Sequence, residues 1–478
     1  MTPELSSLVF GTEAPPLPPI KLTAGRLSAE FEPTSGMLRY VQWDTTEVLR
    51  GIYANVRRAD WSTVDPVLSD VEVEENESHF RVLWSATHVA SGVDFSWRGE
   101  VSGDDRGNLT YRLDGEPSED LVTNRTGICI LHPATLAGTS FTAFAAGQEQ
   151  SGEFPTLIAP DVLLTDLEAI TYAPGPGITS EIKFEGDRFE TEDQRNWGDN
   201  SYKSYVYPQT RPMPYTLAAG QSVRQGISLQ IHVNKVVSAT SSISEAVIAR
   251  KDDETRPVPA LQMSESVVEA TDFPDLNRNR PDPNLSVRLR GTPQTHLRDP
   301  RTLFENVITL RDQANSARRF TKGSVSLNPY EFHPGGDDPR WNSLLGLAWS
   351  VAACAAAMRA NFDGFSIKGM DDPAVLPHLL WDDLQGACFE EAKIICGDTS
   401  PEPQLAHLTL RAGNLRRVIL ANLTPNIIPF PVSGDLSGAE IFGLDETNVS
   451  GTPPPTLLKF IAATPLPPYA YRRIDARV

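Results

Sequence analysis

Charged and aromatic side chains are concentrated in one segment, residues 184–205, which reads FEGDRFETEDQRNWGDNSYKSY. Its carboxylates could act as a general base or accept hydrogen bonds from hydroxyl groups, and its cations could stabilise an oxyanion. Its tryptophan offers a flat apolar face for a sugar-like ring. The candidate site residues are Glu190, Glu192, Asp193, Arg195, Asn196, Trp197, Asp199 and Lys203. A salt-bridged surface hairpin is the alternative, because structural ion-pair networks also gather charges.

Strand alternation divides these candidates between two faces. An extended strand places Glu190 and Glu192 on one face and Asp193 on the other. Both glutamates can then face a ligand, as catalytic carboxylates, while Asp193 binds Arg195 or backbone amides. Trp197 and Lys203 fit the wall of a domain interface equally well.

Arg125 and His132 are two further candidate ligand contacts, and both lie in the run 124–133, NRTGICILHP. A strand places them on opposite faces unless a bulge or turn intervenes. A histidine before a proline is also compatible with a purely structural role. The sequence therefore leaves open whether the two side chains reach one ligand.

The middle of the chain contributes a third group of candidates. His296, a candidate catalytic residue, and Gln294 lie just before Asp299, at the expected end of a strand, where barrel enzymes carry their chemistry. Polar residues that close a strand-to-helix turn are the alternative, and it applies equally to the candidate substrate-binding residues Asp272, Asn277 and Arg278. Asp299, followed by a proline, is the predicted N-cap of the next helix.

Composition limits the classes of partner. The net charge of -20 disfavours a nucleic-acid backbone or an anionic membrane surface as the main ligand and is easier to reconcile with a small neutral molecule. The four cysteines show no CxxC spacing and the eight histidines are scattered, so no metal site and no cofactor are predicted. The first residues lack a basic segment followed by an apolar core, and the longest apolar run, 344–358, is shorter than the ~20 residues that span a bilayer. We therefore expect a cytoplasmic protein.

The pattern of apolar residues and turns along the chain predicts a multidomain α+β protein with three parts. Short alternating segments separated by turns indicate an N-terminal β domain over 1–235, of the size of a large two-sheet sandwich. Helical patterns alternate with short apolar runs over 236–398, which indicates βα units. Strand patterns return over 399–478 and predict a C-terminal β-sandwich. The predicted helices are 301–320, 340–360 and 381–396.

Two long motifs resemble the D-apionate lactonase family. The run 124–133 matches that family's NRxGFxxLHP stretch, and 186–205 matches its GDxFExEDQRNWTDASxKTY stretch. Weaker agreement continues at 271–281, at 293–296 and beyond. The resemblance implies an enzyme that opens D-apionolactone to D-apionate, with an N-terminal β-supersandwich, a middle (β/α) barrel and a C-terminal β domain.

The middle part is too short for that barrel. Residues 236–398 number 163, whereas a complete (β/α)₈ barrel needs about 250. We therefore expect an incomplete barrel with fewer than eight parallel strands. Its unpaired strand edges must be covered by the N-terminal domain, by the acidic stretch 251–271 or by a second copy of the chain in a homo-oligomer. We also expect 184–205 to form one wall of a concave pocket shared with the middle domain.

Three functions remain open on the sequence alone. The first is a lactone hydrolase that uses water attack without a metal, because no GxSxG nucleophile motif and no HExxH metal motif is present. The second is a non-catalytic carbohydrate-binding paralogue with a shortened barrel. The third is a glycoside hydrolase, which would need two carboxyl groups about 5 Å or ~6.5–9.5 Å apart across a groove.

Overall fold

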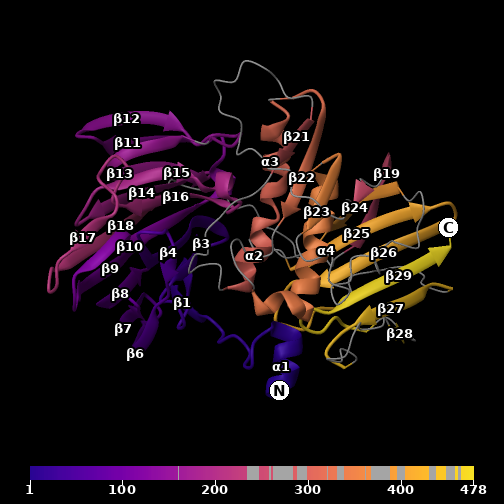
Figure 1. Cartoon of the computed structure of the whole chain (residues 1–478), viewed down its shortest axis with the longest axis horizontal. Helices are drawn as coiled ribbons and strands as arrows, with labels where there is room; N and C mark the ends of the chain where they lie inside the picture. The colour runs from indigo at the N-terminus through magenta and orange to yellow at the C-terminus, as the bar shows by residue number, and fades with distance from the viewer. Residues whose placement is uncertain are drawn as a thin grey trace. The chain divides into compact units, whose positions relative to one another are not determined.

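The computed structural model of the protein divides into two compact units (Figure 1). One unit comprises residues 17–239 with 292–298, and the other comprises 1–16, 240–291 and 299–478. The structure describes residues 1–159, 161–233, 247–257, 260–261, 284–287, 299–319, 321–330, 338–360, 362–367, 388–395, 404–429, 438–447, 458–460 and 464–477.

The first unit is built almost entirely of β-structure, as the alternating pattern predicts. Its strands are β1 (Ile20–Ala24), β2 (Leu27–Phe31), β3 (Leu38–Trp43), β4 (Thr46–Arg58), β5 (Thr63–Val64), β6 (Val67–Asn76), β7 (His79–Ala90), β8 (Val93–Asp104), β9 (Asn108–Pro117), β10 (Leu121–Pro133), β11 (Ser140–Ala145), β12 (Gln148–Glu153), β13 (Val162–Gly175), β14 (Ile178–Glu185), β15 (Phe189–Asp193), β16 (Ser201–Val206), β17 (Tyr215–Leu217) and β18 (Val223–Val233), with short 3-10 turns η1 (Ala134–Leu136) and η2 (Gln194–Trp197). All eighteen strands are connected by hydrogen bonds, and their pairings are antiparallel, so neighbouring strands need only short turns between them.

One large apolar core holds this unit together. Long strands such as β7 and β8 alternate buried and more exposed positions along their length. Inward residues such as Trp84, Tyr111 and Ile182 are 2% exposed or less and belong to one cluster that draws on most of the strands. The prediction of a β-sandwich over the N-terminal part is confirmed at this level. Its extent over 1–235 and the supersandwich assignment stay predictions.

The second unit contains the helices and a parallel sheet. The helices are α1 (Pro3–Phe10), α2 (Pro300–Asn306), α3 (Thr309–Ala317) and α4 (Leu344–Arg359), with a 3-10 turn η4 (Pro339–Asn342). The parallel sheet has the order β20 (Ala260–Leu261), β23 (Gly364–Ile367), β22 (Ser324–Tyr330) and β21 (Asn284–Val287). The described part of this unit thus has four parallel strands, where the sequence predicts fewer than eight. The incomplete barrel itself stays a prediction.

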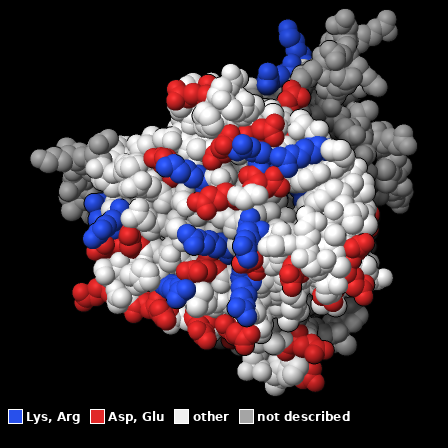
Figure 2. All heavy atoms as spheres, turned by 90° about the vertical axis from the view of Figure 1, so that its left-hand side faces the viewer, with Lys and Arg blue, Asp and Glu red and all other residues white. Residues whose placement is uncertain are grey.

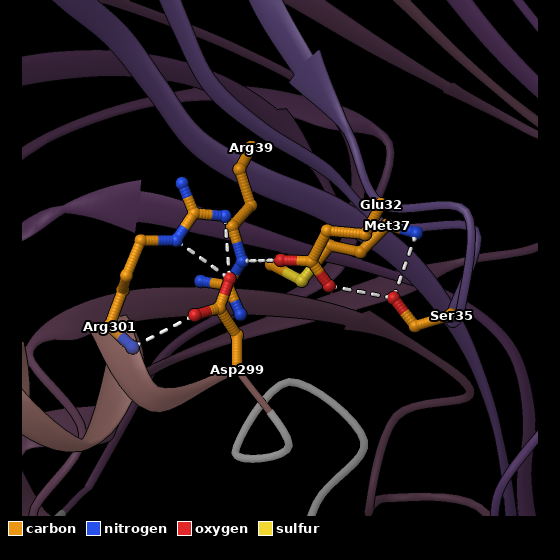
Figure 3. Close-up of polar contacts among 6 residues, drawn as sticks. All are labelled: Glu32, Ser35, Met37, Arg39, Asp299 and Arg301. Carbon is orange, nitrogen blue, oxygen red and sulfur yellow. Dashed lines mark hydrogen bonds and ion pairs between the residues drawn. The ribbon is translucent and has the colours of Figure 1, made fainter. Parts of the chain in front are cut away.

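Helix α2 begins as the sequence predicts. Asp299 is its N-cap and accepts a hydrogen bond from the Arg301 backbone N–H at 2.8 Å, and Pro300 occupies the first helical position. The Asp299 carboxylate also accepts from the Arg301 guanidinium at 2.8 Å, as Figure 3 shows. The cap and the ion pair together fix the first turn. The predicted helix 301–320 forms as two shorter helices, α2 and α3, separated by a turn at 307–308.

An antiparallel sheet completes the second unit. Its order is β19 (Val247–Pro257), β24 (Cys388–Ile395), β25 (Leu405–Ala412), β26 (Leu415–Asn422), β29 (Tyr471–Arg477), β27 (Glu440–Leu444) and β28 (Leu458–Phe460). The helix predicted over 381–396 is wrong for 388–395, which pair as a strand with β19 and β25. The segment CFEEAKII mixes helix formers with apolar residues, and tertiary pairing outweighs that weak local preference. The division of this unit at residue 398 stays a prediction.

The first helix of the chain belongs to this second unit. Phe10 of α1 meets the ring of Tyr469 edge-on, with centroids 5.7 Å apart, and Tyr469 also stacks on Phe304 at 6.0 Å. Helix α4, the predicted buried apolar helix, is covered on nearly all sides. Among the described residues, no helix combines the length and the apolar character needed to cross a membrane.

Candidate functional site

Four adjacent strands of the first unit, β4, β10, β16 and β15, have two different faces. Residues such as Ala54 and Ile130 on one face join the large apolar core. Tyr53 and Cys129 on the other face instead belong to a small separate cluster. Because successive residues of a strand point to opposite sides, this assigns the remaining positions of each strand.

The second face carries the candidate chemistry, and we call it the polar face. It consists of Tyr53, Asn55 and Arg57 from β4, Arg125 and Cys129 from β10, Glu190 and Glu192 from β15, and Lys203 and Tyr205 from β16. The predicted alternation of the two glutamates against Asp193 is therefore confirmed. So is the prediction that Arg125 and His132 lie on opposite faces, although a register shift does occur between Thr123 and Arg125.

Glu190 is the most constrained acid of the polar face. One of its carboxylate oxygens accepts a hydrogen bond from the Tyr205 hydroxyl at 3.0 Å and pairs with the Arg125 guanidinium at 3.4 Å. The other accepts from the Gln209 backbone N–H at 3.1 Å. Burial raises the pKa of Glu190, against the opposing effects of the Tyr205 hydroxyl and Arg125. Glu190 thus holds three donors in place around a carboxylate that is 1% exposed.

Arg125 is held by aromatic rings as well as by Glu190. Its guanidinium carbon lies 3.4 Å from the centre of the Tyr205 ring and 5.3 Å from that of Trp61. Arg57 reaches the same Trp61 ring at 5.9 Å. Cation–π contacts of this kind fix the plane of the guanidinium while its N–H groups stay directed at oxygen ligands.

Lys203 is a buried cation of the polar face. It pairs across the strands with Glu192 and lies 5.5 Å above the ring of Tyr53. Burial lowers the pKa of Lys203 to about 8, and Glu192 acts in the opposite direction. Burial, reinforced by Cys129, raises the pKa of the neighbouring Tyr53 hydroxyl. Lys203 is therefore poised to change its charge not far above neutral pH, within reach of a partly exposed carboxylate.

Asp193 and Arg195 form a buried structural pair instead. Both side chains are 0% exposed, and the Arg195 guanidinium contacts the Asp193 carboxylate at 2.8 and 2.9 Å. Arg195 also donates to the Pro155 carbonyl at 2.6 Å, while Asp193 accepts from the Ala159 N–H at 3.1 Å. The predicted bonding of Asp193 to Arg195 or to backbone amides is confirmed in both forms. The pair ties η2 to the segment 155–159.

His132 lies on the core side of the sheet. Its ring nitrogens bond to the Tyr172 hydroxyl at 3.1 Å and to the Ser204 hydroxyl at 2.8 Å, and the residue is 0% exposed. Burial lowers the pKa of His132 to about 3, so the ring is neutral at physiological pH. The structure therefore does not bring His132 together with Arg125.

The other predicted site residues have separate placements. Asp199 is buried and lies close enough to Lys203 to act on its charge, whereas Trp197 is 46% exposed on η2 beside Asn196. Five predicted site residues lie outside the described residues: Asp272, Asn277, Arg278, Gln294 and His296. The predicted pocket between 184–205 and the middle domain stays a prediction.

Sequence reasoning missed several residues of the polar face. Tyr53, Asn55 and Arg57 occupy alternate positions in the buried part of β4, which also contains the buried Arg50. That alternation of polar residues at 53, 55 and 57 is a usable signal, since buried strands seldom carry three polar groups on one face. Tyr205, the cross-strand partner of Glu190, is the last residue of the charge-rich segment 184–205.

Another buried acid, Glu32, lies in the turn before β3, which is next in the sheet after β4. Glu32 accepts hydrogen bonds from the Ser35 hydroxyl at 2.8 Å and from Arg39, and the Met37 N–H donates to Ser35 at 3.3 Å (Figure 3). Met37 packs with Tyr53 in the small cluster of the polar face. This turn therefore fixes the edge of the polar face, and the Glu32 carboxylate is already occupied by Ser35 and Arg39.

Charge on the outer surface is mixed. Figure 2 shows Lys and Arg side chains interspersed with Asp and Glu over the face that it presents. The exposed cross-strand pair of Arg224 with Asp114, at 3.2 Å, and the half-exposed pair of Arg81 with Glu100, at 3.0 Å, are of this kind. Among the described residues, no group of three or more His, Cys, Asp or Glu side chains is arranged to hold a metal ion.

Comparison with known proteins identifies relatives of the first unit. Residues 7–234 match the family described as D-apionate lactonase, N-terminal domain. The D-apionate lactonase of Brucella anthropi is 37% identical over 227 residues, which is 47% of this chain and 37% of that protein's own length.

Solved structures with low similarity cover the same share of the chain. The Slr1438 protein of Synechocystis sp. PCC 6803 has a TM-score of 0.35 and 10% identity, and covers 46% of this chain and 97% of its own. A galactose 1-epimerase of Lactobacillus acidophilus has a TM-score of 0.31 and 7% identity, and the match covers 45% of this chain and 95% of that protein. A GalM/aldose epimerase homologue of C. elegans has a TM-score of 0.32 and 10% identity, and the match covers 45% of this chain and 99% of that protein. TM-scores this low support no further conclusion.

Proposed function

Because residues 7–234 belong to the D-apionate lactonase N-terminal domain family, we propose that the chain hydrolyses a sugar-derived lactone, of the type that converts D-apionolactone to D-apionate. The proposal is carried by one observation: the polar face gathers two carboxylates, two guanidiniums and a lysine of lowered pKa on one side of a sheet within the matched region. Lactone opening needs a base for water and a positive group for the oxyanion, and both are available there.

The roles follow from accessibility and hydrogen bonding. Glu192 is partly exposed and is the base that takes a proton from water, whose oxygen attacks the lactone carbonyl carbon. The oxyanion that forms is stabilised by Lys203 or Arg57. Collapse of the tetrahedral intermediate breaks the ring C–O bond, and the leaving alkoxide recovers the proton from Glu192. Glu190 acts as a positioning residue, because it fixes Arg125 and Tyr205.

The wider organisation belongs to the same proposal. We assign residues 1–235 to a β-supersandwich, 236–398 to an incomplete (β/α) barrel and 399–478 to a β-sandwich, in a cytoplasmic enzyme. His296 and Gln294 would add a second base and a hydrogen-bond partner from the barrel. Association of two copies would cover the open edges of the barrel sheet.

A binding paralogue is the second candidate, and one observation favours it. The match spans 37% of the length of the Brucella anthropi lactonase, so most of that enzyme lies outside it. A chain of this kind would bind sugar acids without opening lactones.

Proton release with a panel of aldonolactones, D-apionolactone among them, separates the candidates. Turnover above the spontaneous rate supports the lactonase. Binding of the same lactones or their acids without turnover supports the binding paralogue. Cleavage of aryl glycosides, with no activity on lactones, would instead support a glycoside hydrolase.

A further inference from the structure

The polar face contains two buried polar atoms that have no partner. The Asn55 side-chain oxygen and the Arg125 Nε–H each lack a hydrogen-bond partner within the part of the chain that the structure describes. Asn55 is 3% exposed and Arg125 is 7% exposed, so both groups are largely removed from solvent. A buried polar group without a partner costs roughly 1–3 kcal/mol, so a ligand that satisfies both groups would recover part of that free energy.

The two residues are close neighbours on the same face. Strands β4 and β10 pair directly, with Asn55 opposite Gly127 and Arg57 opposite Arg125. Asn55 and Arg125 therefore occupy diagonal positions, which lie about 7–8 Å apart in such a pair. Gly127, the residue opposite Asn55, has no side chain of its own, and the Gln225 side chain occupies the position that a Cβ there would take.

The rest of the Arg125 side chain is already fixed. Glu190 binds its terminal NH2 group, and Tyr205 and Trp61 hold the guanidinium plane. Its Nε–H thus points from a prearranged position, and the loss of entropy on binding a ligand there is small. The Asn55 oxygen offers the complementary acceptor.

We propose that Asn55 and Arg125 together bind one hydroxyl group of a polyhydroxylated ligand. A hydroxyl donates its proton to the Asn55 oxygen and accepts from the Arg125 Nε–H, so it satisfies both groups at once. A carboxylate would satisfy only Arg125, because it cannot donate. The site therefore selects a hydroxylated sugar acid or lactone over a deoxygenated one. This inference rests on the proposed function and names a specificity residue, Asn55, for it.

The test compares ligands that differ by one hydroxyl. Calorimetric titration of the full chain with C4 to C6 aldonates and their single-deoxy analogues gives the dissociation constants. We expect one hydroxyl whose removal weakens binding to the parent protein by about tenfold to a hundredfold, the range for loss of one buried hydrogen-bonding group. Asn55→Ala should weaken the full aldonate by a similar factor and leave the matching deoxy analogue unchanged. Asn55→Asp, which keeps an acceptor oxygen, should restore part of the discrimination.

Ser180 supplies a matched control. Its hydroxyl is also buried without a partner among the described residues, but it lies on β14 between Ile178 and Ile182, which belong to the apolar core. Ser180→Ala should therefore leave every aldonate affinity unchanged, and thermal unfolding shows whether each variant is folded.

The outcomes separate this inference from the proposed function. Lactone turnover by the parent with no effect of Asn55→Ala on Kd, on KM or on the deoxy discrimination would overturn the role of Asn55 and leave the lactonase intact. Aldonate binding that depends on Asn55, without turnover, would support this site and overturn the lactonase. No binding of any aldonate or lactone at millimolar concentration would overturn both, and would mean that a water molecule satisfies the two groups.

Discussion

Replacing Asp193 by asparagine should destabilise the first unit strongly, because the substitution removes the partner of a buried cation. The Arg195 guanidinium is 0% exposed and keeps its charge at any accessible pH. The Asp193 carboxylate accepts from the Arg195 backbone N–H at 3.2 Å, from its Nε at 2.9 Å and from its terminal NH2 group at 2.8 Å. Removing one partner of such a pair costs about 3–5 kcal/mol, because the remaining charge stays buried without that carboxylate.

The measurement is urea unfolding followed by tryptophan fluorescence, with the change in the free energy of unfolding taken at constant m value. Asp187→Asn is the matched control, because it breaks a pair with Arg211 at 2.7 Å whose side chains are 29% and 33% exposed. Exposed pairs contribute about 0–1 kcal/mol, so the control should lose no more than that. If both variants lost less than about 1 kcal/mol, the structural role of the Asp193–Arg195 pair would be refuted.

Four further outcomes are expected. Glu190→Gln and Glu192→Gln should each lower lactone opening by about a hundredfold or more, with Glu181→Gln on β14 as control; turnover equal to the parent's in both would exclude the polar face from the mechanism. Burial lowers the pKa of Lys203 to about 8 in the folded protein, so between pH 8 and the usual lysine pKa this side chain is protonated only in the unfolded chain. The free energy of unfolding should therefore rise with pH in that range, by up to about 3 kcal/mol. Lys203→Met should flatten that rise in thermal unfolding measured from about pH 7 to 10. His132→Ala should cost about 1–3 kcal/mol in urea unfolding, because it leaves Tyr172 and Ser204 with fewer partners, and should not change any aldonate Kd; a changed Kd would return His132 to the ligand site. Treatment with a chelator should leave lactone opening unchanged, and lost activity restored by a divalent cation would contradict water attack without a metal.

Period-two patterns predicted most of the β-structure of this chain. Val223 to Val233 and Leu109 to Leu113 alternate as expected and form β18 and β9. The same reasoning assigned Glu190 and Asp193 to opposite faces, because alternation depends only on local backbone geometry. Local signals also located the N-cap at Asp299.

Long-range pairing could not be predicted in this way. The segment 388–395 becomes a strand because β19 and β25 offer it partners that are distant in the sequence. Asn55 escaped notice for a related reason: its importance depends on Arg125, which comes seventy residues later in the chain and becomes a neighbour only through the pairing of β4 with β10. The charge-rich segment 184–205 contained both members of the Asp193–Arg195 pair, but composition alone could not separate a buried structural pair from a ligand site.

The packing of α1 has a consequence for how the chain is made. The ring of Phe10 rests on Tyr469, so residues from opposite ends of the chain share one compact unit. During synthesis the first helix has no residue of the second unit to pack against until the whole β unit that follows it has been translated. The second unit can close only when residue 469 has left the ribosome, by which time the first can already be folded. A polypeptide that began at residue 17 would lack the Phe10 ring that packs on Tyr469, so part of its loss of stability would arise near the C-terminus, although the missing residues are N-terminal.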